Sequence, residues 1–221
     1  MDQPSWRAAV MRHPEPLPGS SPWVGPPPTP VPIRIVEYDA AWPEQFEAVA
    51  AGIRAALGPE ALSIEHVGST SVPGLPAKPV IDVDLTVADS ASEQDYVPLL
   101  EGAGYRLRIR EPEWHEHRCL VRDSPEDDPQ VNLHVFGPGC PETVRHRMFR
   151  DWLRANPASL AEYRDAKVAA ASASTEQRVM DYNQRKQPVI RAIYERLFRA
   201  AGWLDGTVSN AEPSTEPNPE E

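Results

Sequence analysis

The chain has 221 residues, of which 40% are hydrophobic, and this length suits one domain of ordinary size with terminal extensions. No run of about 18 apolar residues occurs, which excludes a transmembrane helix, and no secretory signal pattern is visible. The net charge of −11 argues against a duplex-DNA binder that relies on a broad basic face. Two cysteines, Cys119 and Cys140, can build neither a disulfide framework nor a CxxC zinc site. These absences favour a cytoplasmic protein.

The two ends of the chain differ in composition from the middle. Residues 1–32 hold ten of the 26 prolines, and proline has no N–H to give to a helix or a sheet, so we expect an extended or disordered leader. Residues 205–221 hold five acidic residues and no basic ones. We expect them to form a disordered acidic tail. One folded domain over 33–204 remains.

Within this domain the hydrophobic pattern predicts an α+β fold. Helical spacing of apolar residues and capping residues predict helices over 43–57, 92–102, 141–155, 157–172 and 175–201. Alternating apolar residues and flanking turn residues predict strands over 33–37, 62–67, 79–87, 105–110, 118–122 and 131–136. Pro98 should disturb the second helix, Pro188 should kink the last, and the acidic stretch 123–128 should be a hairpin loop. We expect a mixed β-sheet with a C-terminal helical layer.

The strongest local signal for chemistry is the Asp-x-Asp sequence in the strand predicted over 79–87. Alternate side chains of a strand share one face, so Asp82 and Asp84 point the same way, about 7 Å apart. Two carboxylates repel each other, and a bridging divalent cation removes that cost; hard oxygen ligands suit Mg²⁺. The alternative is that the two acids lie on a solvent-exposed face and keep a sheet edge soluble.

A pair of small residues, Gly68-Ser69, directly follows the strand predicted over 62–67. Such a pair lets backbone N–H groups approach a phosphate, and the serine hydroxyl adds a donor. An ordinary turn would explain the pair equally well. However, a strand, Gly-Ser, a short loop and a strand with Asp-x-Asp together resemble the layout of the nucleotidyltransferase fold of the polymerase-β superfamily.

A closer resemblance covers about 33–199 of the chain. The sequence Glu-His-Val-Gly-Ser-Thr-Ser-Val-Pro-Gly-Leu at 65–75 resembles the hallmark motif of the GrpB family, also called UPF0157. Further segments resemble other signatures of the family, namely 36–39, 42–43, 78–84, 132–136, 147–154 and 182–186. The resemblance implies the nucleotidyltransferase fold, and some members of the family are fused to dephospho-CoA kinase.

Basic side chains are candidates for binding the phosphates of a nucleotide beside Gly68, Ser69 and Thr70. Lys78 lies just before the Asp-x-Asp strand, where it could reach a phosphate. The family resemblance implies that Arg150 and Lys186 line the same cleft. Arg150 belongs to a stripe of arginines at helical spacing, and the alternative is that this stripe is an exposed helix face.

One strand departs from the pattern of the superfamily, which normally carries a third carboxylate there. The strand 131–136 presents Asn132, His134 and Phe136 on one face and no acid. His134 is a candidate general base or third metal ligand, because imidazole suits either role, and a structural histidine is the alternative.

Two further histidine positions are assigned structural roles. We expect His66 to be a satisfied core histidine close to Gly68, and we expect His115 and His117 to lie in a solvated loop. Metal binding by the latter pair is the minor alternative.

Taken together, the sequence predicts an Mg²⁺-dependent nucleotidyltransferase-like protein. It would transfer a nucleotidyl group from an NTP, with ATP as first choice, to a small-molecule acceptor. Asp82 and Asp84 would hold the metal and, with His134, act in catalysis. Two alternatives remain: a non-catalytic nucleotide- or CoA-related binding module, and a folding or interaction domain that binds no nucleotide. The sequence indicates no protein partner, acceptor or oligomeric state.

Overall fold

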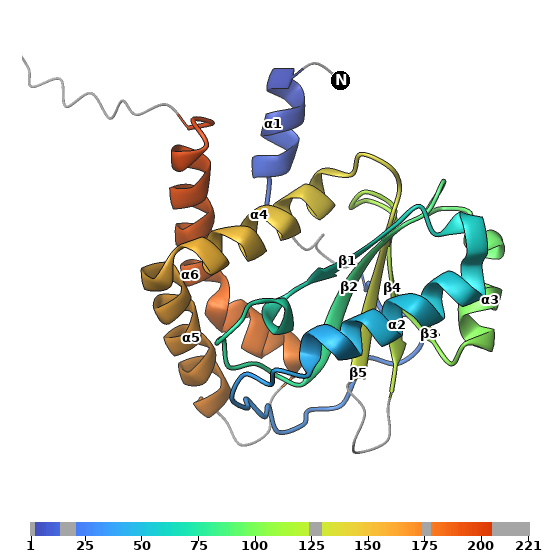
Figure 1. Ribbon diagram of the computed structural model, residues 1–221, viewed down its shortest axis with the longest axis horizontal. Coiled ribbons are helices and arrows are strands. Elements are labelled where there is room, and N and C mark those ends of the chain that lie inside the picture. The colour runs from blue at the N-terminus through green and yellow to red at the C-terminus, as the bar shows by residue number, and fades with distance from the viewer. Residues whose placement is uncertain (1–2, 14–20, 124–129, 174–177, 205–221) are drawn as a thin grey trace, which may run out of the picture.

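A five-stranded mixed sheet forms the centre of the computed structural model, which describes residues 3–13, 21–123, 130–173 and 178–204 (Figure 1). The strands are β1 (Ser63–Val67), β2 (Val80–Thr86), β3 (Arg106–Glu111), β4 (His117–Arg122) and β5 (Gln130–Phe136). Their order across the sheet is β1-β2-β5-β4-β3. β2 and β5 run parallel, and the other neighbouring pairs run antiparallel.

Helices surround this sheet and confirm the predicted α+β class. They are α1 (Gln3–Met11), α2 (Trp42–Leu57), α3 (Val97–Gly102), α4 (Pro141–Ala155), α5 (Pro157–Ser172) and α6 (Val179–Ala200). Three short 3₁₀ turns are η1 (Gly58–Glu60), η2 (Ser69–Ser71) and η3 (Glu93–Asp95). In Figure 1, α4, α5 and α6 gather beside β1 as the expected C-terminal helical layer, and α2 lies in front of the sheet. None of the helices in the described ranges is both long and apolar enough to cross a bilayer.

One face of the sheet is apolar and packs against α2. The strands contribute fully buried aliphatic residues to it, namely Ile81, Val83 and Leu85 of β2 and Val131, Leu133 and Val135 of β5. Phe46, Val49 and Ile53 of α2 join the same core, because the helical spacing of these residues puts them on one side of the helix. Burying each large aliphatic side chain stabilises the fold by about 1.5–3 kcal/mol.

The opposite face of the same strands is polar. The register of β2 and β5 puts Asp82 beside Asn132 and Asp84 beside His134. α4 covers this face, since His146 of α4 reaches Asp84. β2, the strand that carries the two acids, therefore lies between α2 on one side and α4 on the other. The candidate site lies between β2 and α4.

The N-terminal leader contains a packed helix, so the expectation of an extended or disordered segment is wrong for α1. Val10 is fully buried among residues of α6, and the ring of Trp6 lies 5.9 Å from that of Trp203. The proline argument fails here because the only proline of α1, Pro4, stands in its first turn, where proline is tolerated. Farther along the leader, Trp23 forms a bridge with Ile109 at the edge strand β3.

Most of the remaining predicted elements agree with the structure, with three local differences. The strand expected over 33–37 is a single bridge between Val36 and Ala77. The helix expected over 92–102 begins only at Val97, because Pro98 can stand in a first turn but not in a helix interior. α6 begins at Val179 and continues as helix on both sides of Pro188. The acidic tail 205–221 and residues 124–129 of the hairpin loop lie outside the described residues.

Candidate functional site

The turn that follows β1 lies directly against Asp82. Gly68 adopts φ +68°, a left-handed conformation that favours glycine, and a Cβ placed on it would lie 2.2 Å from Asp82 Oδ2. The Ser71 hydroxyl donates to the Gly68 carbonyl oxygen at 2.6 Å and closes the turn. The juxtaposition of Gly68 and Asp82, expected from the sequence, is therefore present in the structure.

Both carboxylates of the Asp-x-Asp pair have protein partners. Asn132 Nδ2 donates to Asp82 Oδ1 at 2.8 Å, which leaves Oδ2 facing Gly68. His146 Nδ1 lies 3.1 Å from Asp84 Oδ1 and 2.9 Å from Oδ2. Because β2 is a central strand and the Asp84 side chain is only 2% exposed, the alternative of a solvent-exposed acidic edge is wrong.

His146 links Asp84 to a second carboxylate, that of Glu142 on the same helix. Its Nε2 lies 3.2 Å from Glu142 Oε1. Burial opposes protonation of the imidazole, but Asp84 and Glu142 outweigh burial and raise the pKa of His146 to about 10. Although burial alone would favour a neutral Glu142, His146 and Arg145 lower the pKa of this acid to about 2. At neutral pH an imidazolium therefore stands between two carboxylates.

This arrangement bears on the predicted metal site. Within the described ranges, no group of three or more His, Cys, Asp or Glu side chains is arranged to hold a metal ion. Of the predicted pair, Asp82 keeps Oδ2 toward the Gly68 turn, whereas both oxygens of Asp84 contact His146. Metal binding at Asp84 would therefore compete with the His146 ion pair.

His134 stands at the end of a hydrogen-bonded chain across the polar face. His117 Nε2 lies 3.0 Å from His134 Nδ1, and His117 Nδ1 lies 2.7 Å from Glu111 Oε2. Burial and the neighbouring His117 lower the pKa of His134 to about 4, so this imidazole is neutral at pH 7. The expected solvated loop is wrong for His117, which begins β4 and is buried because the β3–β4 register brings it opposite Glu111.

The three lysines of the chain converge on two tyrosines, although they come from three separate segments. Lys186 Nζ lies 4.1 Å from the ring centroid of Tyr182, and Lys78 Nζ lies 5.5 Å from the same centroid. Lys167 Nζ lies 5.4 Å from the ring centroid of Tyr163. The structure thus brings together two predicted phosphate-binding residues, Lys78 and Lys186, and a third lysine that sequence reasoning did not single out.

These ammonium groups are poorly compensated. Burial lowers the pKa of all three lysines, that of Lys186 to about 8 and that of Lys167 well below its ordinary value. Asp82 acts in the opposite direction on each of them. Lys167 Nζ is buried without a hydrogen-bond partner among the described residues. Burial therefore disfavours positive charge on these three amino groups, and an anion beside them would favour it.

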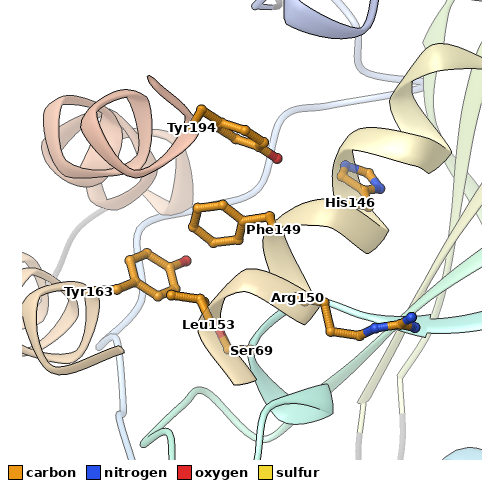
Figure 2. A pocket seen from close by; sticks show the side chains of 8 residues that line it. Ser69, His146, Phe149, Arg150, Leu153, Tyr163 and Tyr194 are labelled. Carbon is orange, nitrogen blue, oxygen red and sulfur yellow. The ribbon is translucent and has the colours of Figure 1, made fainter. Parts of the chain in front are cut away.

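The Arg150 side chain is bound to the end of β1 and does not lie on an exposed helix face. Its Nη1 donates to the His66 carbonyl oxygen at 2.9 Å and to Glu65 Oε2 at 3.2 Å. Figure 2 shows the Arg150 side chain extending from α4 toward the sheet. The exposed-face alternative is therefore wrong for this arginine. A pocket of about 80 Å³ lies beside it, lined by Gly68, Ser69, His146, Phe149, Arg150, Leu153, Tyr163 and Tyr194.

Thr70 and His66 hold the turn from inside. The Thr70 hydroxyl donates to the Val80 carbonyl oxygen at 3.2 Å and lies 3.0 Å from His66 Nε2. His66 stacks on Phe46, with ring centroids 4.6 Å apart, and burial lowers its pKa to about 4. The expected core histidine is confirmed. Thr70 is 1% exposed and its hydroxyl is engaged, which supports a structural role instead of the predicted phosphate contact.

The site residues that sequence reasoning missed are His117, His146 and Lys167. His146 follows Glu142 by four residues on a predicted helix, a spacing that brings two side chains together and could have marked it. Lys167 was one of only three lysines, and this scarcity was its one signal. For His117 the deciding contact, with His134, lies across the sheet and leaves no local pattern.

Comparisons with known proteins agree with this fold. Residues 32–196 match a family model described as GrpB protein. A UPF0157 protein of Halalkalibacterium halodurans is 49% identical over 164 residues, covering 74% of this chain and 82% of that protein. The crystal structure of conserved protein GrpB from Enterococcus faecalis superposes with a TM-score of 0.66 at 30% identity, covering 76% of this chain and 99% of that one. A dephospho-CoA kinase of Mycolicibacterium paratuberculosis is 32% identical over 205 residues, covering 80% of this chain and 48% of the kinase.

Proposed function

Because the chain belongs to the GrpB family, the UPF0157 proteins, we propose that it is an Mg²⁺-dependent nucleotidyltransferase-like protein. It transfers a nucleotidyl group from an NTP, with ATP as first choice, to a small-molecule acceptor. The observation that carries the proposal is the close approach of Gly68 to Asp82, where even a methyl group would collide with the carboxylate. Phosphates held by the backbone N–H groups of Gly68 and Ser69 would lie beside this acid.

Asp82 and Asp84 are the residues that would hold Mg²⁺. They offer oxygen ligands on one face of β2, which is the ligand type that this ion prefers. When bound, Mg²⁺ would neutralise negative charge on the phosphates and on the leaving pyrophosphate. His146 keeps Asp84 paired in the ligand-free protein, so this ion pair has to open before Asp84 can act as a ligand.

His134 is the proposed general base, in place of the acid that the superfamily carries on this strand. Glu111 Oε2 can accept a hydrogen bond from His117 Nδ1–H, and His117 Nε2 can then accept one from His134 Nδ1–H. This order leaves His134 Nε2 without a proton, which is the form that can take one from an acceptor hydroxyl. The pKa of about 4 makes His134 a weaker base than an ordinary imidazole.

A thermal-shift panel tests the proposal. ATP, GTP, CTP and UTP are added with and without Mg²⁺ to the wild type, Asp82→Asn and Asp84→Asn. A ligand at about 100 times its Kd stabilises by about 2.7 kcal/mol, which is several degrees in Tm. We expect an Mg²⁺-dependent rise for the wild type and for Asp95→Asn, a control at an exposed acid of η3, and no rise for Asp82→Asn. Unchanged Mg-NTP binding and transfer in Asp82→Asn would make this mechanism wrong.

A non-catalytic nucleotide- or CoA-related binding module is the second candidate. It is favoured by Asn132, which stands hydrogen-bonded to Asp82 on the strand where the superfamily carries its third acid. The similarity to a dephospho-CoA kinase points to the same alternative. Adding CoA and dephospho-CoA to the panel separates the two: the module binds one of these ligands without Mg²⁺ and releases no pyrophosphate from any NTP.

A further inference from the structure

The lysine cluster, defined as Lys78, Lys167 and Lys186, contains every lysine of the chain. The other 19 basic residues are all arginines. Lys167 and Lys186 each follow a tyrosine by four residues on the consecutive helices α5 and α6, and Lys78, from the distant segment before β2, reaches the ring of Tyr182. Lysine differs from arginine in carrying a compact point charge, which suits a small oxyanion.

The amino groups of the lysine cluster have no close carboxylate partner among the described residues. No described carboxylate lies within 4 Å of any of the three ammonium groups, although Arg and His pairs of this kind occur throughout the fold. Lys167 is 2% exposed and its Nζ has no hydrogen-bond partner in the part of the chain that the structure describes. Asp82 is the acid that influences all three lysines, and Asn132 already binds its Oδ1. A buried polar group without a partner is costly, and an anion at this place would pair the amino groups and favour their charged form.

We propose that the lysine cluster binds a phosphate group, with Lys167 as its most buried anchor. This inference rests on the proposed function in one respect: the phosphate belongs to a ligand that also meets the Gly68 turn. Tyr163 connects the two places, since it lines one pocket with Gly68 and Ser69 while its ring lies beside Lys167 and Lys186. The phosphate comes either from the NTP or from a phosphorylated acceptor, which present the same chemistry to the three ammonium groups.

The test measures inorganic pyrophosphate binding without Mg²⁺, in the presence of a chelator. Titration calorimetry and Tm are compared for the wild type, Lys167→Met and Arg164→Met. The last variant is the matched control, because Arg164 lies on the same helix and pairs with Asp165 on the surface. We expect Lys167→Met to bind pyrophosphate at least tenfold more weakly, while the control keeps the wild-type affinity.

The Tm of the ligand-free variant separates an anion site from a structural role. If Lys167 awaits an anion, Lys167→Met removes a buried amino group that has no described partner, and the Tm stays level or rises, by about 2–4 °C. A lower Tm together with undiminished pyrophosphate affinity would overturn the proposal. If Lys167→Met does not fold, Lys78→Met takes its place, because Lys78 is only half-buried. An unchanged affinity of Lys78→Met for pyrophosphate would also overturn the proposal.

The pyrophosphate test of the lysine cluster and the nucleotide test of the proposed function can fail separately. Mg-ATP binding that is lost in Asp82→Asn, together with pyrophosphate binding that is undiminished in Lys167→Met, would contradict the lysine cluster and leave the proposed function standing. Pyrophosphate binding that depends on Lys167, without any NTP binding, would contradict the proposed function and support the lysine cluster. Competition identifies the source: ATP displaces pyrophosphate if the cluster serves the nucleotide, and both bind together if it serves a phosphorylated acceptor.

Discussion

The two faces of β2 are both covered by helices, yet they are stabilised in different ways. On the face toward α2, Ile81, Val83 and Leu85 belong to the large apolar core. On the face toward α4, Asp82 and Asp84 each need a specific partner, because a buried polar group without one is costly. A cavity is therefore the main cost on the apolar face, and a polar group without a partner is the main cost on the polar face. Reactive groups can gather only on the second.

The lysine cluster extends this contrast. Asp82, Asp84 and His134 have described partners, namely Asn132, His146 and His117. Next to them, Lys167 has none among the described residues. Lys167 Nζ is one of five buried side-chain polar atoms without a partner among the described residues, and it is the one lysine nitrogen of the five. Four substitutions test the contrast between the faces.

The largest effect is expected on the apolar face. Leu133→Ala removes a fully buried side chain from the middle of β5 and leaves a cavity, which should lower the free energy of unfolding by about 2–5 kcal/mol. Chemical denaturation measures this loss, and pyrophosphate or nucleotide binding at temperatures where the variant is folded should not change. A weaker affinity for either ligand would show that the two faces are coupled.

Gly68→Ala acts where the turn meets the polar face. The new Cβ would collide with Asp82 and the backbone would be strained at φ +68°, so we expect a loss of about 2–4 kcal/mol. Gly74→Ala is the control, because Gly74 also has a positive φ, of +77°, but apart from its chain neighbours no heavy atom of the described residues lies within 4 Å of its Cβ position. That variant should lose only about 1 kcal/mol. Equal losses in urea unfolding would mean that the approach to Asp82 is not tight.

The pH dependence of the stability of Lys186→Met tests how burial affects the charge of Lys186. Burial lowers the pKa of Lys186 from 10.5 to about 8. Between pH 8 and 10.5 the unfolded chain therefore binds more protons than the folded one, so the stability of the wild type rises with pH in this window. The variant should be more stable by on the order of 3 kcal/mol at pH 7, with the difference closing toward pH 10.5.

Unfolding curves of both proteins at several pH values measure this difference. Asp82 and the other two lysines are the charged neighbours of Lys186 and are common to both proteins, so their effects largely cancel. Burial raises the pKa of Tyr163 to about 12 and also raises that of Tyr182, so neither tyrosine titrates first. A stability difference that does not vary with pH would contradict the prediction.

Asn132→Asp is the smallest and most specific change. It replaces a hydrogen bond to Asp82 by a third carboxylate, which should cost about 1–2 kcal/mol without Mg²⁺ at pH 7. Millimolar Mg²⁺ should restore Tm in the variant more than in the wild type, because the ion would neutralise the added repulsion. An equal response of both proteins to Mg²⁺ would argue against a metal at Asp82.

The sequence alone determined most of the local structure. α4 and α5 have the predicted bounds, and the alternation in β2 correctly assigned Asp82 and Asp84 to one face. These features were predictable because periodicity and capping depend on residues close together in the chain. The family motif added the expectation that Gly68 and the Asp-x-Asp strand belong to one site.

Only the tertiary structure decided which faces meet. His117 reaches His134 through the β3-β4-β5 register, His146 reaches Asp84 through the docking of α4, and Lys167 reaches the other lysines through α5 and α6. Periodicity says which side chains share a face but not what that face will pack against. Contacts between distant segments depend on how strands pair and helices dock, and that is set by burial summed over the whole domain.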